Sequence, residues 1–288
     1  RVQYAVGRMG VANVWQAIGS IATLVTVYVA AAVNLGDALF VAVATFAPVL
    51  MGLLNSIGFF GSSTGRPIRP DVRCFRVSLL AELFSLGSRF LLIMVLTSAA
   101  LGTDAWIVAQ TGSLEAATAF SVPARIFALL SVVVSILNVP LWPIAVEALK
   151  RGDVGWVEHA VRRMTVISVS VVTASAAIGV VAGPVAIDVW LGGAVAPSTF
   201  FLTGLGLWAI VQALVAPAFM VQNAAEVLQP QIVGYALLLV VIPVKWWVSS
   251  AAGFEWLPYV SVIGYSVFMI PASYVGYRRA IPVAASVE

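Results

Sequence analysis

Charged side chains are scarce in this 288-residue sequence, because aspartate, glutamate, lysine and arginine together make up only 9% of it. Soluble globular domains carry about 25% of these residues. Hydrophobic residues reach 61%, and the mean hydropathy is +1.04. A surface with so few charges is suited to hydrocarbon, where each charged side chain has a large free-energy cost. The composition therefore excludes an ordinary soluble domain and predicts an integral membrane protein.

Cysteine and histidine are each represented once, and this restricts the chemistry that the chain can perform. With Cys74 alone, neither an internal disulfide nor a cysteine metal cluster is possible. His159 lies in a charged loop, so a serine–histidine site or a zinc-protease site within the membrane is not expected. The basic residues form no stripe for nucleic acid. We therefore expect no cofactor, no nucleic-acid partner and no enzymatic activity.

Long uncharged stretches recur along the chain. A membrane-spanning helix needs about 20 mostly apolar residues. Runs such as 237–242 are continuously apolar and do not alternate as the strands of membrane barrels do. The sequence therefore predicts an all-α, multi-pass transmembrane bundle with spans near 13–33, 38–60, 84–110, 116–147, 164–188, 198–223, 229–249 and 257–277. Because it begins at Arg1 and not at methionine, we also expect it to come from the middle of a longer protein.

The basic residues are distributed asymmetrically among the predicted loops. Eight spans place twelve of the fifteen lysines and arginines on one side and none in the loops of the other side. Such an excess is typical of cytoplasmic loops, so both ends of the chain are predicted to be cytoplasmic. The twelve residues are Arg1, Arg8, Arg66, Arg69, Arg73, Arg76, Lys150, Arg151, Arg162, Arg163, Arg278 and Arg279.

Four charges fall inside predicted spans, apart from Glu147 and Asp188 at the last residue of two of them. Asp104 and Arg125 lie at equal sequence distances from the turn between consecutive spans, so they are predicted to lie at similar depth and to pair. Two interpretations remain open for them: a pair that locks two helices together, or the polar wall of a water-filled cavity. Arg89 is interpreted as reaching the inner headgroups or as an anion contact. Lys245, beside two tryptophans, is interpreted as an anchor at the outer border.

Polar residues accompany these charges at helical spacing. Thr97, Asp104 and Thr111 recur every seven residues, as do Thr118 and Arg125. Each helix is therefore predicted to carry a polar stripe on one face.

Several segments resemble a known family of transporters. They are residues 103–110 (TDAWIVAQ) with 119–127 (AFSVPARIF), residues 140–148 (PLWPIAVEA) with 151–153 and 156–157, residues 13–17 (NVWQA) and residues 190–192 (WLG). Together they resemble the O-antigen and polysaccharide lipid-linked-oligosaccharide flippases of the multidrug/oligosaccharidyl-lipid/polysaccharide exporter superfamily.

The resemblance implies a two-lobed helical bundle around a central cavity, with twelve to fourteen spans, of which the first lobe is incomplete here. Members of the family move undecaprenyl-diphosphate-linked oligosaccharides across the bacterial cytoplasmic (inner) membrane by alternating access. By this resemblance Arg125, Arg89 and Gln110 are expected to contact substrate, and Asp104 is expected to couple an ion or to form a structural pair. Partners would be membrane lipid and other polysaccharide-assembly membrane proteins.

Other functions remain open at this point. A multidrug or metabolite exporter of the same superfamily would use acidic and aromatic cavity residues rather than arginine. A membrane enzyme acting on lipid-linked sugars would need larger outer loops than this sequence has. An inactive fragment or scaffold is the remaining alternative.

Overall fold

The computed structural model describes residues 2–6, 8–34, 36–71, 77–193 and 196–285. Within these ranges every regular element is helical, and eight helical segments are long and apolar enough to cross a membrane. Helices satisfy their own backbone hydrogen bonds, as a segment in hydrocarbon must. The structure thus confirms the predicted all-α, multi-pass bundle. The residues Arg1, Arg73, Cys74 and Arg76 lie outside the described ranges.

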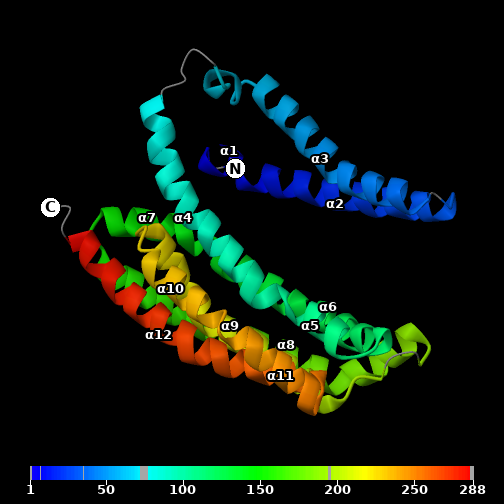
Figure 1. The fold of residues 1–288 in the computed structure, drawn as a ribbon. Helices are drawn as coiled ribbons and strands as arrows, with labels where there is room; N and C mark the ends of the chain where they lie inside the picture. Colours follow the sequence, from blue (N-terminus) through cyan, green and yellow to red (C-terminus); the bar gives the residue numbers. More distant parts are fainter. Residues whose placement is uncertain (1, 7, 35, 72–76, 194–195, 286–288) are drawn as a thin grey trace. The chain divides into compact units, whose positions relative to one another are not determined.

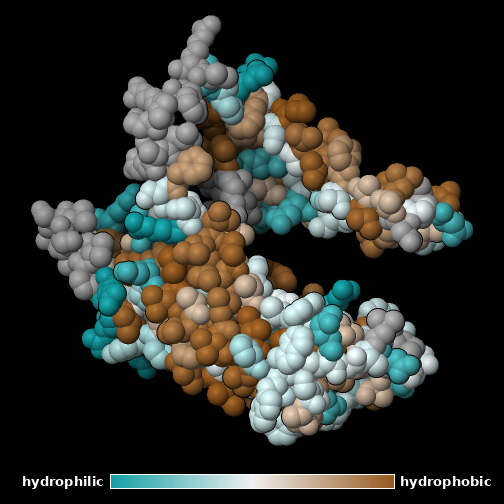
Figure 2. Space-filling model, in the orientation of Figure 1, coloured by the Kyte–Doolittle hydropathy of each residue, from teal (hydrophilic) through white to brown (hydrophobic). Residues whose placement is uncertain are grey.

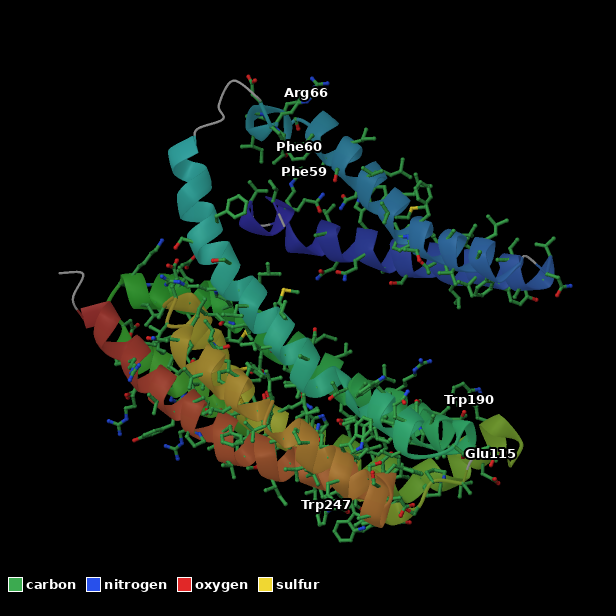
Figure 3. All side chains as sticks on the ribbon, in the orientation of Figure 1. Phe59, Phe60, Arg66, Glu115, Trp190 and Trp247 are labelled. Carbon is green, nitrogen blue, oxygen red and sulfur yellow. The ribbon has the colours of Figure 1, made fainter. Side chains whose placement is uncertain are left out.

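The first of two compact units, residues 1–79, is built on a hairpin of two spans (Figure 1). Its elements are α1 (Val2–Ala5), α2 (Met9–Ala32), α3 (Asp37–Gly61) and the 3-10 turn η1 (Arg66–Ile68). The two long helices approach closely at Gly19, where an added Cβ would lie 3.6 Å from the Met51 Cβ. The Gln3 amide donates to the Asn55 Oδ1 at 2.8 Å and ties α1 to α3. Phe59, Phe60 and Arg66 lie where α3 ends (Figure 3).

The second unit, residues 80–288, contains six spans. Its elements are α4 (Val77–Gly102, from residue 80 onward), α5 (Asp104–Thr111), α6 (Leu114–Asn138), α7 (Leu141–Lys150), α8 (Val154–Leu191), α9 (Thr199–Ala224), α10 (Gln229–Leu238), α11 (Val241–Ala252), η3 (Phe254–Trp256) and α12 (Leu257–Ala285).

Helix α9 is the centre of this unit, because α6, α7, α8 and α12 all pack against it. Its residues Phe201, Leu202 and Ala213 are almost fully buried. The flank of the unit seen in Figure 2 is largely apolar, as expected of a surface that faces lipid. Glu115, Trp190 and Trp247 lie toward one end of the unit (Figure 3), and both tryptophans are exposed, as is typical of the headgroup region.

Three of the six spans consist of two helices with a break between them. Span 4 breaks between α6 and α7 at Pro140, and Pro143 lies in the first turn of α7. Span 7 breaks between α10 and α11, and Pro243 lies in the first turn of α11. A first turn tolerates proline because its N–H groups have no partner within the helix. Span 3 breaks at Thr103, between α4 and α5, without a proline.

The glycines Gly179 and Gly183 of α8 allow close helix packing, as their four-residue spacing predicts. A Cβ added at Gly179 would lie 3.0 Å from the Phe127 ring of α6. A Cβ added at Gly183 would lie 3.0 Å from the Leu202 side chain of α9. The two glycines on one face of α8 therefore leave room for side chains from α6 and α9.

We expect Gly276→Ala to destabilise the second unit by about 1–3 kcal/mol, the usual effect of overfilling a packed interior. The Gln222 amide fills the space where a Cβ at Gly276 would lie. That amide donates to the carbonyl oxygens of Ser273 at 2.9 Å and Ala272 at 3.4 Å, and a displaced side chain would lose both bonds. The measurement is the apparent melting temperature of the purified protein in detergent.

Gly87→Ala is the matched control, because an added Cβ at Gly87 in α4 meets nothing within 4 Å. Alanine has the higher helix propensity, so this variant should be as stable as the parent or more stable. Equal melting temperatures for the two variants would contradict the steric explanation.

Candidate functional site

Eight polar side chains follow the contact between α4–α5, α10–α11 and α12, and we call this set the polar seam. Its members are Thr97, Asp104, Thr111, Tyr235, Lys245, Ser249, Ser261 and Tyr265. The three members on α4–α5 are those that recur every seven residues in the sequence. Their predicted common face is therefore confirmed, since each meets a polar partner from the later spans.

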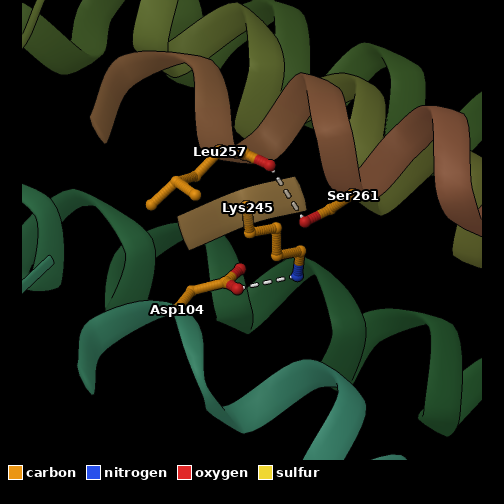
Figure 4. Close-up of polar contacts among 4 residues, drawn as sticks. All are labelled: Asp104, Lys245, Leu257 and Ser261. Atoms are coloured by element: carbon orange, nitrogen blue, oxygen red, sulfur yellow. Dashed lines mark hydrogen bonds and ion pairs between the residues drawn. The ribbon is translucent and has the colours of Figure 1, made fainter. Parts of the chain in front are cut away.

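The centre of the polar seam is an ion pair between Asp104 and Lys245 (Figure 4). The Lys245 Nζ donates to the Asp104 Oδ1 at 2.7 Å, and the side chains are only 3% and 20% exposed for lysine and aspartate. The Ser261 hydroxyl lies near the same carboxylate and donates to the Leu257 carbonyl oxygen at 3.0 Å. The pair joins spans 3 and 7, which are far apart in the sequence.

The break in span 3 contributes to this arrangement. It makes Asp104 the first residue of α5. The N-terminus of a helix carries partial positive charge and unpaired N–H groups, both of which favour a carboxylate. The end of its own helix and the Lys245 ammonium group therefore both favour the charged form of Asp104 and offset part of the cost of burying it.

The predicted pairing of Asp104 with Arg125 is wrong. Asp104 and Lys245 lie at matching depth, because each is seven residues before the last residue of its span, Thr111 or Ala252. The Arg125 side chain is exposed on α6 and forms no hydrogen bond or ion pair with another described residue. Equal depth is a necessary condition for pairing, but the packing of α11 against α5 selects Lys245 as the partner.

The interpretation of Lys245 as an anchor at the membrane border is also wrong. Lys245 is 2% exposed, whereas the neighbouring Trp247 is 69% exposed. The Trp246 ring lies 5.2 Å from the Trp106 ring, across the same contact between α11 and α5. The lysine thus points into the bundle, and the tryptophans next to it cover the outside.

Two further contacts of the polar seam lie on either side of the ion pair. Toward the ends of α5 and α11, the Thr111 and Ser249 hydroxyl oxygens are 2.7 Å apart. On the α4 side, the Thr97 and Tyr265 side chains lie within hydrogen-bonding reach of the Tyr235 hydroxyl. The Tyr265 ring also packs edge-on against Trp208, with 5.0 Å between centroids. The members of the polar seam thus satisfy one another, whereas the buried Thr103 hydroxyl beside Asp104 has no hydrogen-bond partner among the described residues.

Arg125 belongs to a different surface, the exposed face of α6. Thr118, Arg125 and Ser135 are exposed on this helix, Ser121 is partly exposed, and the apolar residues Leu129, Val132 and Ile136 are exposed beside them. The exposed residues of α8 between 174 and 186 are alanine, valine and isoleucine, and the exposed Ser170 and Thr173 lie just before them. An apolar face of this kind suits lipid, whereas an arginine at membrane depth needs water or a polar partner. Both helices thus expose apolar side chains, and the charge of Arg125 is what distinguishes the α6 face.

The three predicted substrate residues lie at three different depths. Arg89 is two residues after the first residue of span 3, and Gln110 is one residue before its last. At about 1.5 Å per residue, these two positions are separated by roughly 30 Å along the span. Arg125 lies ten residues into span 4. All three side chains are exposed, and the structure does not bring them together at one point.

Among the described residues, no group of three or more histidine, cysteine, aspartate or glutamate side chains could hold a metal ion. Comparison of the chain with family models, with curated proteins and with solved structures gave no match.

Proposed function

We propose that this chain is part of a transporter that moves a polyprenyl-diphosphate-linked oligosaccharide across a membrane by alternating access. The observation that carries the proposal is the exposed Arg125 at membrane depth on α6. A charge that faces lipid at this depth has a large free-energy cost, whereas a charge that faces a water-filled path with an anionic substrate is stabilised. A guanidinium group matches the geometry of phosphate oxygens and binds them through two hydrogen bonds.

Two features of the architecture support a transporter of the proposed kind. The second unit contains six spans, which is the number in each lobe of a two-lobed exporter with twelve spans. Its spans 3, 4 and 7 are interrupted, and interrupted spans are frequent in secondary transporters. The sequence resemblance to lipid-linked-oligosaccharide flippases adds the substrate class. Arg125 would contact the diphosphate, with Arg89 and Gln110 as further contacts along the path.

The role that we propose for Asp104 is structural. Its carboxylate is already bound to Lys245, so the pair holds spans 3 and 7 together at a fixed register. A rigid contact of this kind is what a rocking lobe needs, because the lobe must move as one body.

We propose that the protein lies in the bacterial cytoplasmic membrane with both ends of this chain in the cytoplasm, following the asymmetry of basic residues. In a background in which Cys74 is replaced by serine, cysteines at Ser63 and Ala196 should react with an impermeant reagent from opposite sides. Ser63 follows α3, and Ala196 is an exposed residue between α8 and α9. Periplasmic labelling of both cysteines in intact cells would rule out this topology.

The experiment that tests the proposed function is complementation of a bacterial strain that lacks its lipid-linked-oligosaccharide flippase. The full-length protein should restore surface polysaccharide and reduce the accumulated lipid-linked precursor. Failure to complement any polysaccharide pathway, combined with a gain of drug efflux, would favour the multidrug or metabolite exporter instead.

A further inference from the structure

Six exposed basic residues gather at the end of the second unit where α7 ends, α8 begins and α12 ends. We call them the basic collar; they are Lys150, Arg151, Arg162, Arg163, Arg278 and Arg279. A buried apolar cluster holds the three helix ends together and includes Ala148, Val157 and Ala280. The basic side chains are therefore displayed on a fixed scaffold. Figure 2 shows hydrophilic surface at this end, beside the apolar flank.

Four arginines of the basic collar lie at the border of the hydrocarbon layer. The uncharged stretch 164–187 of α8 directly follows Arg163, and the uncharged stretch 257–277 of α12 directly precedes Arg278. At about 1.5 Å per residue these stretches are roughly 36 Å and 32 Å long, slightly more than the thickness of the hydrocarbon layer. The guanidinium groups at their ends therefore reach the level of the lipid phosphates.

The charge of this end differs from that of the opposite end. Near the basic collar the exposed acidic side chains are Glu147, Asp153, Glu158 and Glu226, and Asp153 accepts a hydrogen bond from the Trp156 N–H as a helix cap. The opposite end of the unit carries Glu115, Asp188 and Glu255 and, among its described residues, no lysine or arginine. An anionic ligand is therefore attracted to one end only.

Aromatic side chains accompany the arginines at the same border. The Arg278 guanidinium lies over the Tyr274 ring, 5.2 Å from its centroid, and Trp156 is exposed at the start of α8. Aromatic rings prefer the headgroup region, where they hold a helix end at a constant depth. This contact orients Arg278 without neutralising its charge, so the guanidinium remains able to bind an anion.

We infer that the basic collar binds the headgroups of anionic phospholipids in the adjoining leaflet. Arginine pairs with a phosphate through two parallel hydrogen bonds. The six cations outnumber the four carboxylates at this end, so its net positive charge attracts anionic lipids over zwitterionic ones. This inference concerns the outer surface of the protein and does not depend on the proposed transport function.

The test is lipid binding to the purified full-length protein by native mass spectrometry, with phosphatidylglycerol and phosphatidylcholine as probes. The parent should retain phosphatidylglycerol in preference to phosphatidylcholine. The double variant Arg163→Gln with Arg278→Gln should weaken phosphatidylglycerol binding by about tenfold or more, since each cation near anionic lipid contributes a severalfold effect. Arg163→Lys with Arg278→Lys should retain most of the binding and controls for folding.

The matched control is Arg8→Gln with Arg69→Gln, which removes the same charge from exposed positions in the first unit. It should bind phosphatidylglycerol at the basic collar as the parent does. Equal retention of the two lipids by the parent, or unchanged phosphatidylglycerol binding by a folded Arg163→Gln/Arg278→Gln variant, would overturn the inference.

Discussion

Lys245→Met is expected to destabilise the protein by about 3–5 kcal/mol, the usual effect of removing one partner of a buried ion pair. The change leaves the Asp104 carboxylate inside the bundle without the ammonium group that lies 2.7 Å away in the parent. The carboxylate must then stay charged in an apolar environment or take up a proton. Asp104→Asn should have a comparable effect, because it leaves the Lys245 cation without its counter-charge.

The double variant Asp104→Asn/Lys245→Met should be more stable than the sum of the single effects predicts, because it buries no unpaired charge. The measurement is a double-mutant cycle on apparent melting temperatures in detergent. Arg125→Met is the matched control, because it removes another cation at membrane depth, but one whose side chain is exposed. Additive single effects for Asp104 and Lys245, or coupling of Asp104 to Arg125 instead, would refute the pair.

Arg125→Gln is expected to abolish most of the transport that the full-length protein supports. A hydrogen bond to a charged group contributes about 1.5–3 kcal/mol, so its loss corresponds to roughly 10-fold to 100-fold weaker binding of the diphosphate. Arg125→Lys should keep part of the activity, because lysine retains the charge and loses the paired hydrogen bonds. The assay is surface polysaccharide in the complemented flippase-deficient strain, at matched levels of membrane protein.

Arg69→Gln is the control for this variant, since it removes an exposed arginine that follows η1 and lies outside the predicted spans. It should complement as the parent does. If Arg125→Gln at a normal protein level restores surface polysaccharide fully, then Arg125 does not bind the headgroup.

The spans and the polar stripe of α4–α5 could be predicted from the sequence because both depend on short-range patterns. Hydropathy over about 20 residues defines a span, and a seven-residue repeat defines a helix face. Thr97, Asp104 and Thr111 therefore appear together on the polar seam as their spacing predicts. Pro140, Pro143 and Pro243 accompany two of the three helix breaks. Pro123, Pro217 and Pro271 lie inside continuous helices, so proline alone does not predict a break.

The partner of Asp104 could not be predicted in the same way. Equal distance from a turn compares the depths of consecutive spans only, whereas span 7 is separated from span 3 by three others along the chain. Asp104 and Lys245 each lie seven residues before the last residue of their span, Thr111 or Ala252, and this equal distance correctly indicates that they lie at the same depth. It identifies Lys245 as the partner only once α11 is known to pack against α5. The break at Thr103 has no proline, but Gly102 followed by Thr103 and Asp104 is the pattern of a helix end and a helix start.

The proposed path along α6 requires that the face around Arg125 borders water, and the reactivity of engineered thiols measures this. Ala128 on α6 and Ala177 on α8 are both exposed, and each is thirteen residues from the end of its span, Glu115 or Trp190. Each is changed to cysteine in a Cys74→Ser background, and membrane vesicles are treated with a charged thiosulfonate reagent. Because only the hydrated thiolate reacts, Ala128→Cys should react about tenfold faster or more than Ala177→Cys. Equal rates at the two positions, or no reaction at Ala128→Cys, would contradict a water-filled path along α6.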